Sequence, residues 1–324
     1  MKTEIFDVVL QSTGAFVDDF HDWEQFPLPT TDFWLSSDIW IGKLPYGISS
    51  DIVFTACAPS GFNFHPSRQY GSHYALVRRV RPLPCDYYTW DSEEIVDRIL
   101  SVARLVHPTT MATMYAARLY FEEGKLDSIV AGPTQGFSAQ VHIPATTKWR
   151  NWLCKAEMED LRVHMQNYIV DAPDRVRQAR RHMTAVFHTY YADQRCALLV
   201  TSLESLLQVG RERMTRQFIS RVQKLAENVG IVITAKEANQ IYSERSSFVH
   251  GDQSNYSDLS EAKLELIRRF ERVLRRALLR ASTDKNFSGI FNKNADIMAA
   301  FGAVESIKKC ELHWEIDGRI IAAP

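Results

Sequence analysis

Hydrophobic residues change their spacing near the middle of the chain. Up to about residue 147 they form short runs, several of which alternate with polar residues, as β-strands do. This pattern predicts strands over residues 4–10, 38–41, 52–57, 74–80 and 137–143, and a hairpin of residues 114–121 and 126–131 with Gly124 in the turn. A helical period stands among them over residues 91–106. We therefore expect a β-rich N-terminal domain over residues 1–147.

From residue 148 the hydrophobic residues recur every three or four positions, which is the period of an amphipathic helix. Helical stripes cover residues 176–190, 196–207, 218–229, 238–249 and 259–278. Short links between such helices are typical of a bundle, expected here over residues 148–283. In the remaining tail, residues 284–324, we expect a short helix at 296–301 and a terminal hairpin around Asp317-Gly318. The predicted fold class is thus α+β, a β-rich domain followed by an all-α bundle.

One helix of this bundle carries a charged residue within its hydrophobic stripe. Thr234 and Glu237 form a capping box at its start, and Gly251 can adopt the left-handed conformation that ends a helix. Between them the stripe comprises Ala238, Ile241, Tyr242, Phe248 and Val249, and Arg245 completes it. A guanidinium on the side of a helix that faces the core is costly unless another group pairs with it. Arg245 therefore requires a partner.

Composition narrows the class of protein. The chain is 45% hydrophobic and 24% charged, as in a globular protein with a sizeable core. No hydrophobic run is long enough to span a membrane, and the N-terminus lacks the pattern of a signal peptide. The five cysteines are dispersed and odd in number, which fits a reducing compartment better than a disulfide framework. We therefore expect a cytoplasmic protein without a membrane partner.

The net charge of −1 conceals an asymmetry. Between Asn151 and Ser282 the chain carries 21 Lys and Arg against 16 Asp and Glu, a net charge of +5, and the rest of the chain carries −6. A basic domain beside an acidic one is compatible with a polyanionic partner for the basic one. Solvated helix faces explain the same charges equally well.

An Arg is followed by a His five positions later three times in the chain, as Arg245 with His250, Arg177 with His182, and Arg68 with His73. The spacing alone means little, and the surrounding residues separate the three cases. Arg177 lies on the polar side of its helix, and Arg68 lies in a stretch rich in Gly and Pro. Arg245 and His250 alone combine a cap, a hydrophobic stripe and a helix-ending Gly.

The stretch Tyr242-Ser243-Glu244-Arg245-Ser246-Ser247-Phe248-Val249-His250-Gly251, after helices that contain Ser202-Leu203-Glu204-Ser205-Leu206, resembles the HEPN superfamily. Within it the chain is most similar to the Apea-like HEPN branch of bacterial anti-phage defence proteins. The resemblance covers roughly residues 152–281. It implies a helical homodimer that cleaves RNA without metal or cofactor, with Arg245 and His250 as catalytic residues. Ser246 follows the Arg as in the family motif, and Tyr242 and Glu204 are expected to support the site.

These residue types suit RNA cleavage, because RNA carries its own nucleophile in the 2′-hydroxyl. A His titrates near neutrality and can move protons, and an Arg presents a planar cation to the phosphate. On a straight helix, five residues correspond to about 140° of rotation. The two side chains therefore converge only if the helix ends between them or if a second protomer supplies the mate. The expected products carry a 2′,3′-cyclic phosphate and a 5′-hydroxyl.

Two other interpretations of the same residues stay open. Arg245 can be a structural residue paired with Glu204, since Arg–Glu pairs occur without catalysis, and His250 can simply cap its helix. The domain is then a non-catalytic module for dimerisation or for binding RNA or protein. If the helical domain is a nuclease, we expect the N-terminal domain to sense a phage-derived or other trigger or to restrain the nuclease, an inference from domain order alone.

Two further candidate sites lie in the N-terminal half. Possible zinc ligands are Cys57, His65, His73 and Cys85, but they lack the short Cys or His knuckle of zinc sites, so we expect no metal. Aromatic and basic residues, which bind single-stranded nucleic acids together, are also frequent: Trp34, Trp40, Phe62, Phe64, Tyr70, Tyr74, Tyr87, Tyr88 and Trp90, with Arg68, Arg78, Arg79 and Arg81. We favour the core and edge of a β-rich domain for these residues. Phosphate-binding glycine loops and the hydrolase elbow are missing from the sequence.

Overall fold

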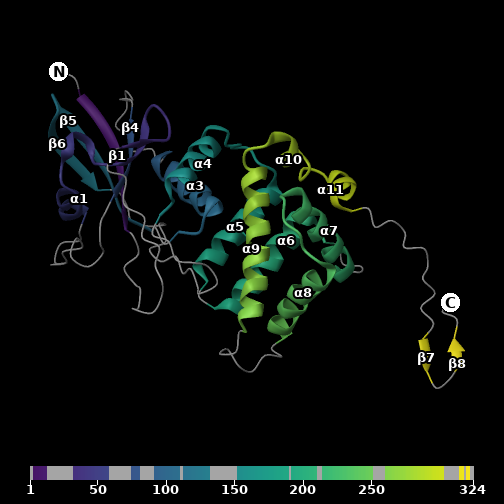
Figure 1. Cartoon of the computed structure of the whole chain (residues 1–324). Helices are drawn as coiled ribbons and strands as arrows, with labels where there is room; N and C mark the ends of the chain where they lie inside the picture. The colour runs from purple at the N-terminus through teal and green to yellow at the C-terminus, as the bar shows by residue number, and fades with distance from the viewer. Residues whose placement is uncertain are drawn as a thin grey trace.

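The computed structural model shows a mixed α+β fold, with strands concentrated in the N-terminal part and helices in the C-terminal part (Figure 1). It describes residues 3–12, 32–57, 74–80, 91–109, 112–131, 152–189, 191–209, 214–250, 260–302, 314–316 and 319–321. The predicted strand at residues 137–143 lies outside these ranges. The α+β class expected from the hydrophobic pattern is therefore confirmed in its general form.

A six-stranded antiparallel sheet, in the order β2-β3-β4-β1-β5-β6, forms the centre of the N-terminal half. Its strands are β1 (Thr3–Ser12), β2 (Phe33–Trp34), β3 (Ile39–Gly42), β4 (Tyr74–Val80), β5 (Ala112–Glu122) and β6 (Lys125–Ala131). The predicted hairpin is the pair β5 and β6, and Gly124 has a φ of 77° in its turn, a conformation that favours glycine. The predicted strands near residues 4–10, 38–41 and 74–80 are confirmed.

The predicted strand at residues 52–57 is wrong, because this segment forms helix α1 (Ser50–Cys57). The amide of Asp51 donates to the hydroxyl of Ser49 at 3.2 Å, which starts the helix. One side of α1 is buried through Val53, whereas Ile52 is 44% exposed. A run of Ile, Val and Phe is compatible with either element, and the packing of Val53 against the sheet decides between them.

The two faces of the sheet bury different sets of side chains. Phe6, Val8 and Leu10 of β1 point to the face covered by α1. Val9 points to the opposite face, which is covered by α3 (Asp91–Val106) and α4 (Lys155–Gln166). The helix predicted over residues 91–106 is thus confirmed. Because α4 packs on the sheet, the hydrophobic core of the N-terminal half extends past residue 147.

The remaining helices share one hydrophobic core around α9 (Figure 1). They are α5 (Asp174–His188), α6 (Ala192–Leu207), α7 (Met214–Asn228), α8 (Ala235–His250), α9 (Glu261–Ala281), α10 (Lys285–Gly289) and α11 (Asn294–Phe301). The short helices α10 and α11 contribute Phe287, Phe291, Ile297 and Phe301 to this core. The bundle therefore includes the first part of the segment expected to be a tail.

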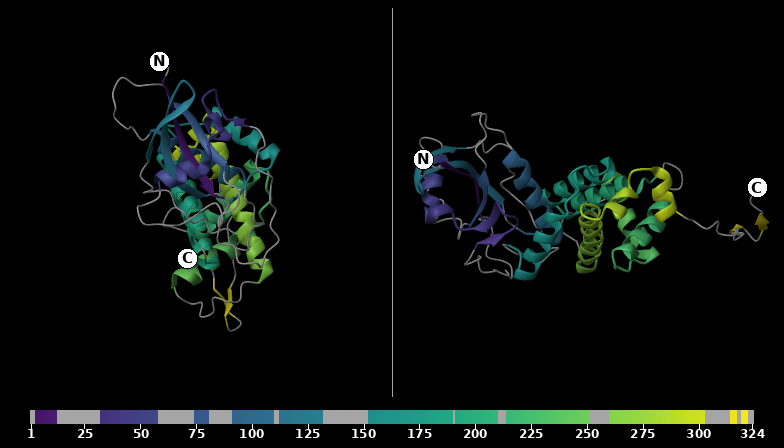
Figure 2. Two further views of the ribbon diagram at one scale, coloured as in Figure 1. Left: turned by 90° about the vertical axis from the view of Figure 1, so that its left-hand side faces the viewer. Right: turned by 90° about the horizontal axis from the view of Figure 1, so that it is seen from above.

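The sheet and the helical bundle lie at opposite ends of the described body and meet at α3, α4 and α9 (Figure 2). Leu105 of α3 is buried in the core of the bundle, and Leu279 of α9 packs against both cores. Arg275 of α9 donates to the carbonyl oxygens of Leu105 at 3.2 Å and Val106 at 3.1 Å, which are the last residues of α3. The end of a helix leaves such carbonyls without a partner in the helix, so Arg275 joins the two halves by capping α3.

Near the C-terminus, β7 (Trp314–Ile316) pairs with β8 (Arg319–Ile321), as predicted, although Asp317 and Gly318 lie outside the described residues. Within the described part of the chain, none of the helices has the length and hydrophobicity needed to cross a membrane.

Candidate active site

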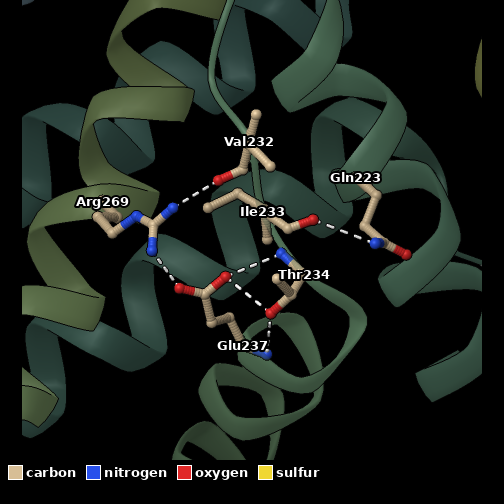
Figure 3. Close-up of polar contacts among 6 residues, drawn as sticks. All are labelled: Gln223, Val232, Ile233, Thr234, Glu237 and Arg269. Carbon is tan, nitrogen blue, oxygen red and sulfur yellow. Dashed lines mark hydrogen bonds and ion pairs between the residues drawn. The ribbon is translucent and has the colours of Figure 1, made fainter.

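Helix α8 begins at a hydrogen-bonded capping box, as the sequence predicts. The amide of Thr234 donates to Oε2 of Glu237 at 2.8 Å, and the amide of Glu237 donates to the hydroxyl of Thr234 at 3.2 Å. Arg269 of α9 pairs with the other carboxylate oxygen of Glu237 and donates to the carbonyl oxygen of Val232 (Figure 3). These contacts fix where α8 starts and therefore which residues face the core.

The predicted stripe of α8 is buried as far as its side chains are described. Ala238 and Ile241 are fully buried, and Tyr242 is 7% exposed with its ring 4.9 Å from that of Phe218. The side chains of Phe248 and Val249 lie outside the described part. The confirmed half of the stripe directs Arg245, three residues after Tyr242, towards the bundle.

Arg245 is half-buried and lies beside Glu204 of α6. Its Nη2 is 3.5 Å from Oε2 of Glu204, and the exposed fractions of the two side chains are 28% and 18%. Its guanidinium carbon lies 6.0 Å from the centre of the Tyr242 ring. In the described part of the chain, no acceptor lies within hydrogen-bonding distance of its buried Nε. The guanidinium is therefore held in position while part of its hydrogen-bonding capacity stays unused.

Burial and the carboxylate of Glu204 both act on the hydroxyl of Tyr242. Burial raises the pKa of Tyr242, and the nearby carboxylate of Glu204 raises it further. Tyr242 is therefore a neutral hydroxyl at physiological pH. The structure thus brings together three of the predicted site residues, Arg245, Glu204 and Tyr242, on two neighbouring helices.

The two other predicted site residues lie further along α8. Ser246 is half-buried and follows Arg245 directly. The helix continues through His250, its last residue, so it does not end between Arg245 and His250. The side chain of His250 and the whole of Gly251 lie outside the described part. Arg245 and His250 therefore do not converge through an end of the helix between them.

Several arginines of α9 bind groups within the protein instead of facing only solvent. Arg276 donates to the carbonyl oxygen of Val229 at 3.3 Å, and Arg280 donates to that of Asn228 at 2.9 Å. Together with Arg269 they bind backbone oxygens at the end of α7 and in the link to α8. Much of the predicted positive charge on α9 thus supports the fold rather than standing free for a polyanion.

The candidate zinc site lies mostly outside the described residues, since only Cys57 is within them. Burial raises the pKa of Cys57 to about 11, which disfavours the thiolate that binds metals. Within the described ranges, His, Cys, Asp and Glu do not form a group of three or more that could hold a metal ion.

Comparison of the chain with protein-family models, with curated proteins and with solved structures finds no match in any of the three. The resemblance to the HEPN superfamily thus rests on the residues around Arg245 and His250 and on the helical context described above.

Proposed function

We propose that the helical half of this protein is a metal-independent endoribonuclease of the HEPN type, in which Arg245 and His250 act on the phosphodiester bond. The observation that carries this proposal is the state of Arg245. Its side chain is packed into the bundle, yet among the described residues it pairs with one carboxylate, at 3.5 Å, and its Nε has no acceptor. A fixed cation with hydrogen-bonding capacity left over is suited to a ligand phosphate.

The reaction needs only proton transfer and charge stabilisation. His250 takes the proton of the 2′-hydroxyl as a general base, and the 2′-oxygen forms a bond to phosphorus. Arg245 stabilises the negative charge that grows on the phosphate oxygens. The bond from phosphorus to the 5′-oxygen breaks, and that oxygen receives a proton from solvent, to which His250 later returns the proton that it took. The products end in a 2′,3′-cyclic phosphate and a 5′-hydroxyl.

A homodimer through the helical half completes the site in this proposal. Because α8 is helical from Ala235 to His250, the two side chains leave it about 140° apart. One copy of the helix therefore does not present both groups to the same phosphate, whereas Arg245 of one protomer can work with His250 of the other. Mixing an Arg245→Gln variant with a His250→Ala variant should then restore one complete site per mixed dimer.

The direct test is cleavage of RNA in EDTA by the purified protein. His250→Ala should reduce cleavage by roughly 100- to 10,000-fold, the usual contribution of a general acid or base. The matched control is His182→Ala, because His182 follows Arg177 at the same spacing on α5, where Arg177 pairs with Asp174. Unchanged cleavage by His250→Ala would exclude the assignment.

A non-catalytic module for dimerisation or for binding RNA or protein is the second candidate, and the ion pair between Arg245 and Glu204 favours it. In that case the protein binds its partner but leaves RNA intact in every condition. The same assay separates the two candidates, because RNA binding is measured alongside cleavage.

The biological setting follows from the resemblance: RNA cleavage in bacterial anti-phage defence, or toxin-like cleavage of cellular RNA. The N-terminal half would then respond to a phage-derived or other trigger. Its contact with α9 through Arg275 supports a regulatory role, because α9 also packs against the helix that carries Glu204.

A further inference from the structure

Five aromatic side chains form a continuous band across one face of the sheet, the face that α1 covers in part. Ring centres of neighbouring members are 4.7 Å apart for Trp34 and Trp40, 5.9 Å for Trp40 and Phe6, 6.3 Å for Phe6 and Tyr46, and 4.9 Å for Tyr46 and Phe121. The band runs from the edge strand β2 to the short turn Pro45–Gly47 above β1 and β5.

The middle of the band belongs to the core, whereas its ends are open to solvent. Trp40, Phe6 and Phe121 are at most 5% exposed, but Trp34 is 42% exposed and Tyr46 is 55% exposed. Helix α1 packs against β5 and β6 and leaves the Trp34 end uncovered. Core packing therefore explains the three inner rings but not the two outer ones.

An exposed cation lies between the two outer rings. Arg79 is on β4, between the strands that carry Trp40 and Phe6, and its guanidinium carbon is 5.6 Å from the centre of the Phe6 ring. The face of an aromatic ring attracts a cation in this position, and the Arg79 side chain is exposed to solvent.

The exposed rings are held rather than free to rotate into solvent. Tyr46 has a φ of 54°, in the left-handed region that costs energy for any residue with a Cβ, and its hydroxyl is bound by Glu4. Trp34 rests on Trp40, whose indole nitrogen donates to the carbonyl oxygen of Lys43 at 3.1 Å. Such strain and fixation of solvent-facing rings is typical of a surface prepared for a ligand.

We propose that this band, with Trp34 and Tyr46 at its ends and Arg79 between them, binds single-stranded nucleic acid. The outer rings Trp34 and Tyr46 are linked through Trp40 and Phe6, so their centres lie at most about 17 Å apart. That length accommodates a few nucleotides, with bases stacked on the two outer rings and a phosphate bound by Arg79. A duplex is excluded from this surface, because its bases are already stacked on one another.

This inference does not rest on the nuclease activity proposed for the helical half. Its test is fluorescence anisotropy of a labelled strand of about ten nucleotides, as RNA and as DNA, against the same strand in a duplex. Binding is measured in EDTA with the His250→Ala protein, so that cleavage of the probe cannot distort the result. The full chain should bind both single strands more tightly than the duplex.

The variants separate stacking from charge. Trp34→Ala or Tyr46→Ala should weaken binding by roughly 5- to 100-fold, the range for the loss of one stacked base, and Trp34→Phe should retain most of the affinity. Arg79→Gln should reduce the salt dependence of binding by roughly one phosphate contact, a slope of about 0.7 for single strands. The matched control is Arg162→Gln, because Arg162 lies 5.7 Å from the Phe33 ring on the other face of the sheet. Circular dichroism shows whether each variant is folded.

The proposal is overturned by any of three results: no binding of single strands, equal binding of the duplex, or wild-type affinity in both Trp34→Ala and Tyr46→Ala. The last result would place the nucleic acid on another surface, such as the helical half. Failure of the nuclease proposal has a different signature, because it leaves the binding measurements unchanged and shows only in the cleavage assay.

Discussion

Two ion pairs join helix α6 to its neighbours, and their surroundings differ sharply. Arg195 of α6 pairs with Glu271 of α9 at 2.8 Å, and the two side chains are 0% and 2% exposed. Glu204 of α6 pairs with Arg245 of α8 at 3.5 Å, and both remain partly accessible to solvent. The first pair is short, buried and complete, whereas the second is long and open to other partners.

The difference indicates which arginine is available for chemistry. A fully buried charge cannot lose its partner without a large cost, so Arg195 is committed to the fold. Glu271 also lies 3.7 Å from Arg275, which in turn caps α3, so the buried cluster continues to the N-terminal half. A partly exposed pair contributes little to stability. In the proposed nuclease, Arg245 would therefore exchange Glu204 for a phosphate at small energetic cost.

The largest effect on stability is expected from breaking the buried pair. Glu271→Gln leaves Arg195 charged and without its carboxylate in the core, which should lower the free energy of unfolding by about 3–5 kcal/mol. Urea denaturation measures this loss. Replacing both residues, as Arg195→Met with Glu271→Leu, should recover most of it. Glu265→Gln is the control, since Glu265 is 51% exposed and pairs with Arg268 on the surface. If Glu265→Gln lost as much stability as Glu271→Gln, this would contradict the comparison of buried and exposed pairs.

The next largest effect concerns the extension of the buried cluster to α3. Burial lowers the pKa of Arg275 to about 10, so this residue is still cationic at neutral pH. Arg275→Met removes its bonds to the carbonyl oxygens of Leu105 and Val106, at an expected cost of about 1–3 kcal/mol. Hydrogen exchange should accelerate in the last turn of α3, where the amide of His107 donates to Ala103. The control is Arg276→Met, which loses one partly exposed hydrogen bond and should leave hydrogen exchange in that turn of α3 slow.

The partly exposed pair of Glu204 and Arg245 should contribute little to stability, whereas Arg245 should contribute strongly to RNA cleavage. Glu204→Gln and Arg245→Gln should each lower the free energy of unfolding by about 1 kcal/mol or less. Arg245→Gln should nevertheless reduce RNA cleavage by roughly 100- to 1,000-fold, as expected when one stabilising donor is lost. Urea denaturation and the cleavage assay in EDTA give the two values. If Glu204→Gln were as destabilising as Glu271→Gln, Arg245 would be a structural residue and the nuclease proposal would lose its main support.

Hydrophobic period predicts the elements of this fold well where one period is clear. Strand β4 and helix α3 have the predicted boundaries. Residues 50–57 are predicted wrongly, because three consecutive bulky hydrophobic residues satisfy both periods and only contact with the sheet decides between them.

The candidate site is predictable only in part, because a sequence shows charges in a stripe but not what they meet. Arg245 stands out for this reason. Arg195 and Glu271 also interrupt hydrophobic stripes, but their pairing depends on α6 and α9 lying side by side, which periodicity does not specify. In the N-terminal half, the aromatics assigned to the core and edge of the β-domain include Trp40 in the core and Trp34 on the edge strand β2. The sequence does not tell the two apart, since exposure depends on how far α1 reaches over the sheet.

The smallest effect is expected at the start of α8, where Glu237 and Arg269 form a third pair that is slightly more exposed than the pair of Glu204 and Arg245. Partial burial by itself would raise the pKa of Glu237, but the hydrogen bonds from Thr234 and the charge of Arg269 outweigh it, and the pKa is lowered from 4.5. A carboxylate with a lowered pKa in the folded state stabilises the protein at a pH above its unfolded value, and this stabilisation is lost as the pH falls through the folded value. Glu237→Gln should therefore lower the free energy of unfolding by about 0.5–1 kcal/mol at neutral pH.

The same reasoning predicts how the gap between wild type and Glu237→Gln depends on pH. Urea denaturation from pH 7 down to about 2 should show a constant gap above pH 4.5 that closes below it. Part of the acid dependence must persist in the variant, because the amide of Phe287 and other donors lower the pKa of Asp284 as well. A gap that stays constant down to the lowest pH would mean that Glu237 stabilises α8 without its charge. The pair of Glu237 and Arg269 would then differ from both ion pairs of α6, because each of those depends on an ionised carboxylate.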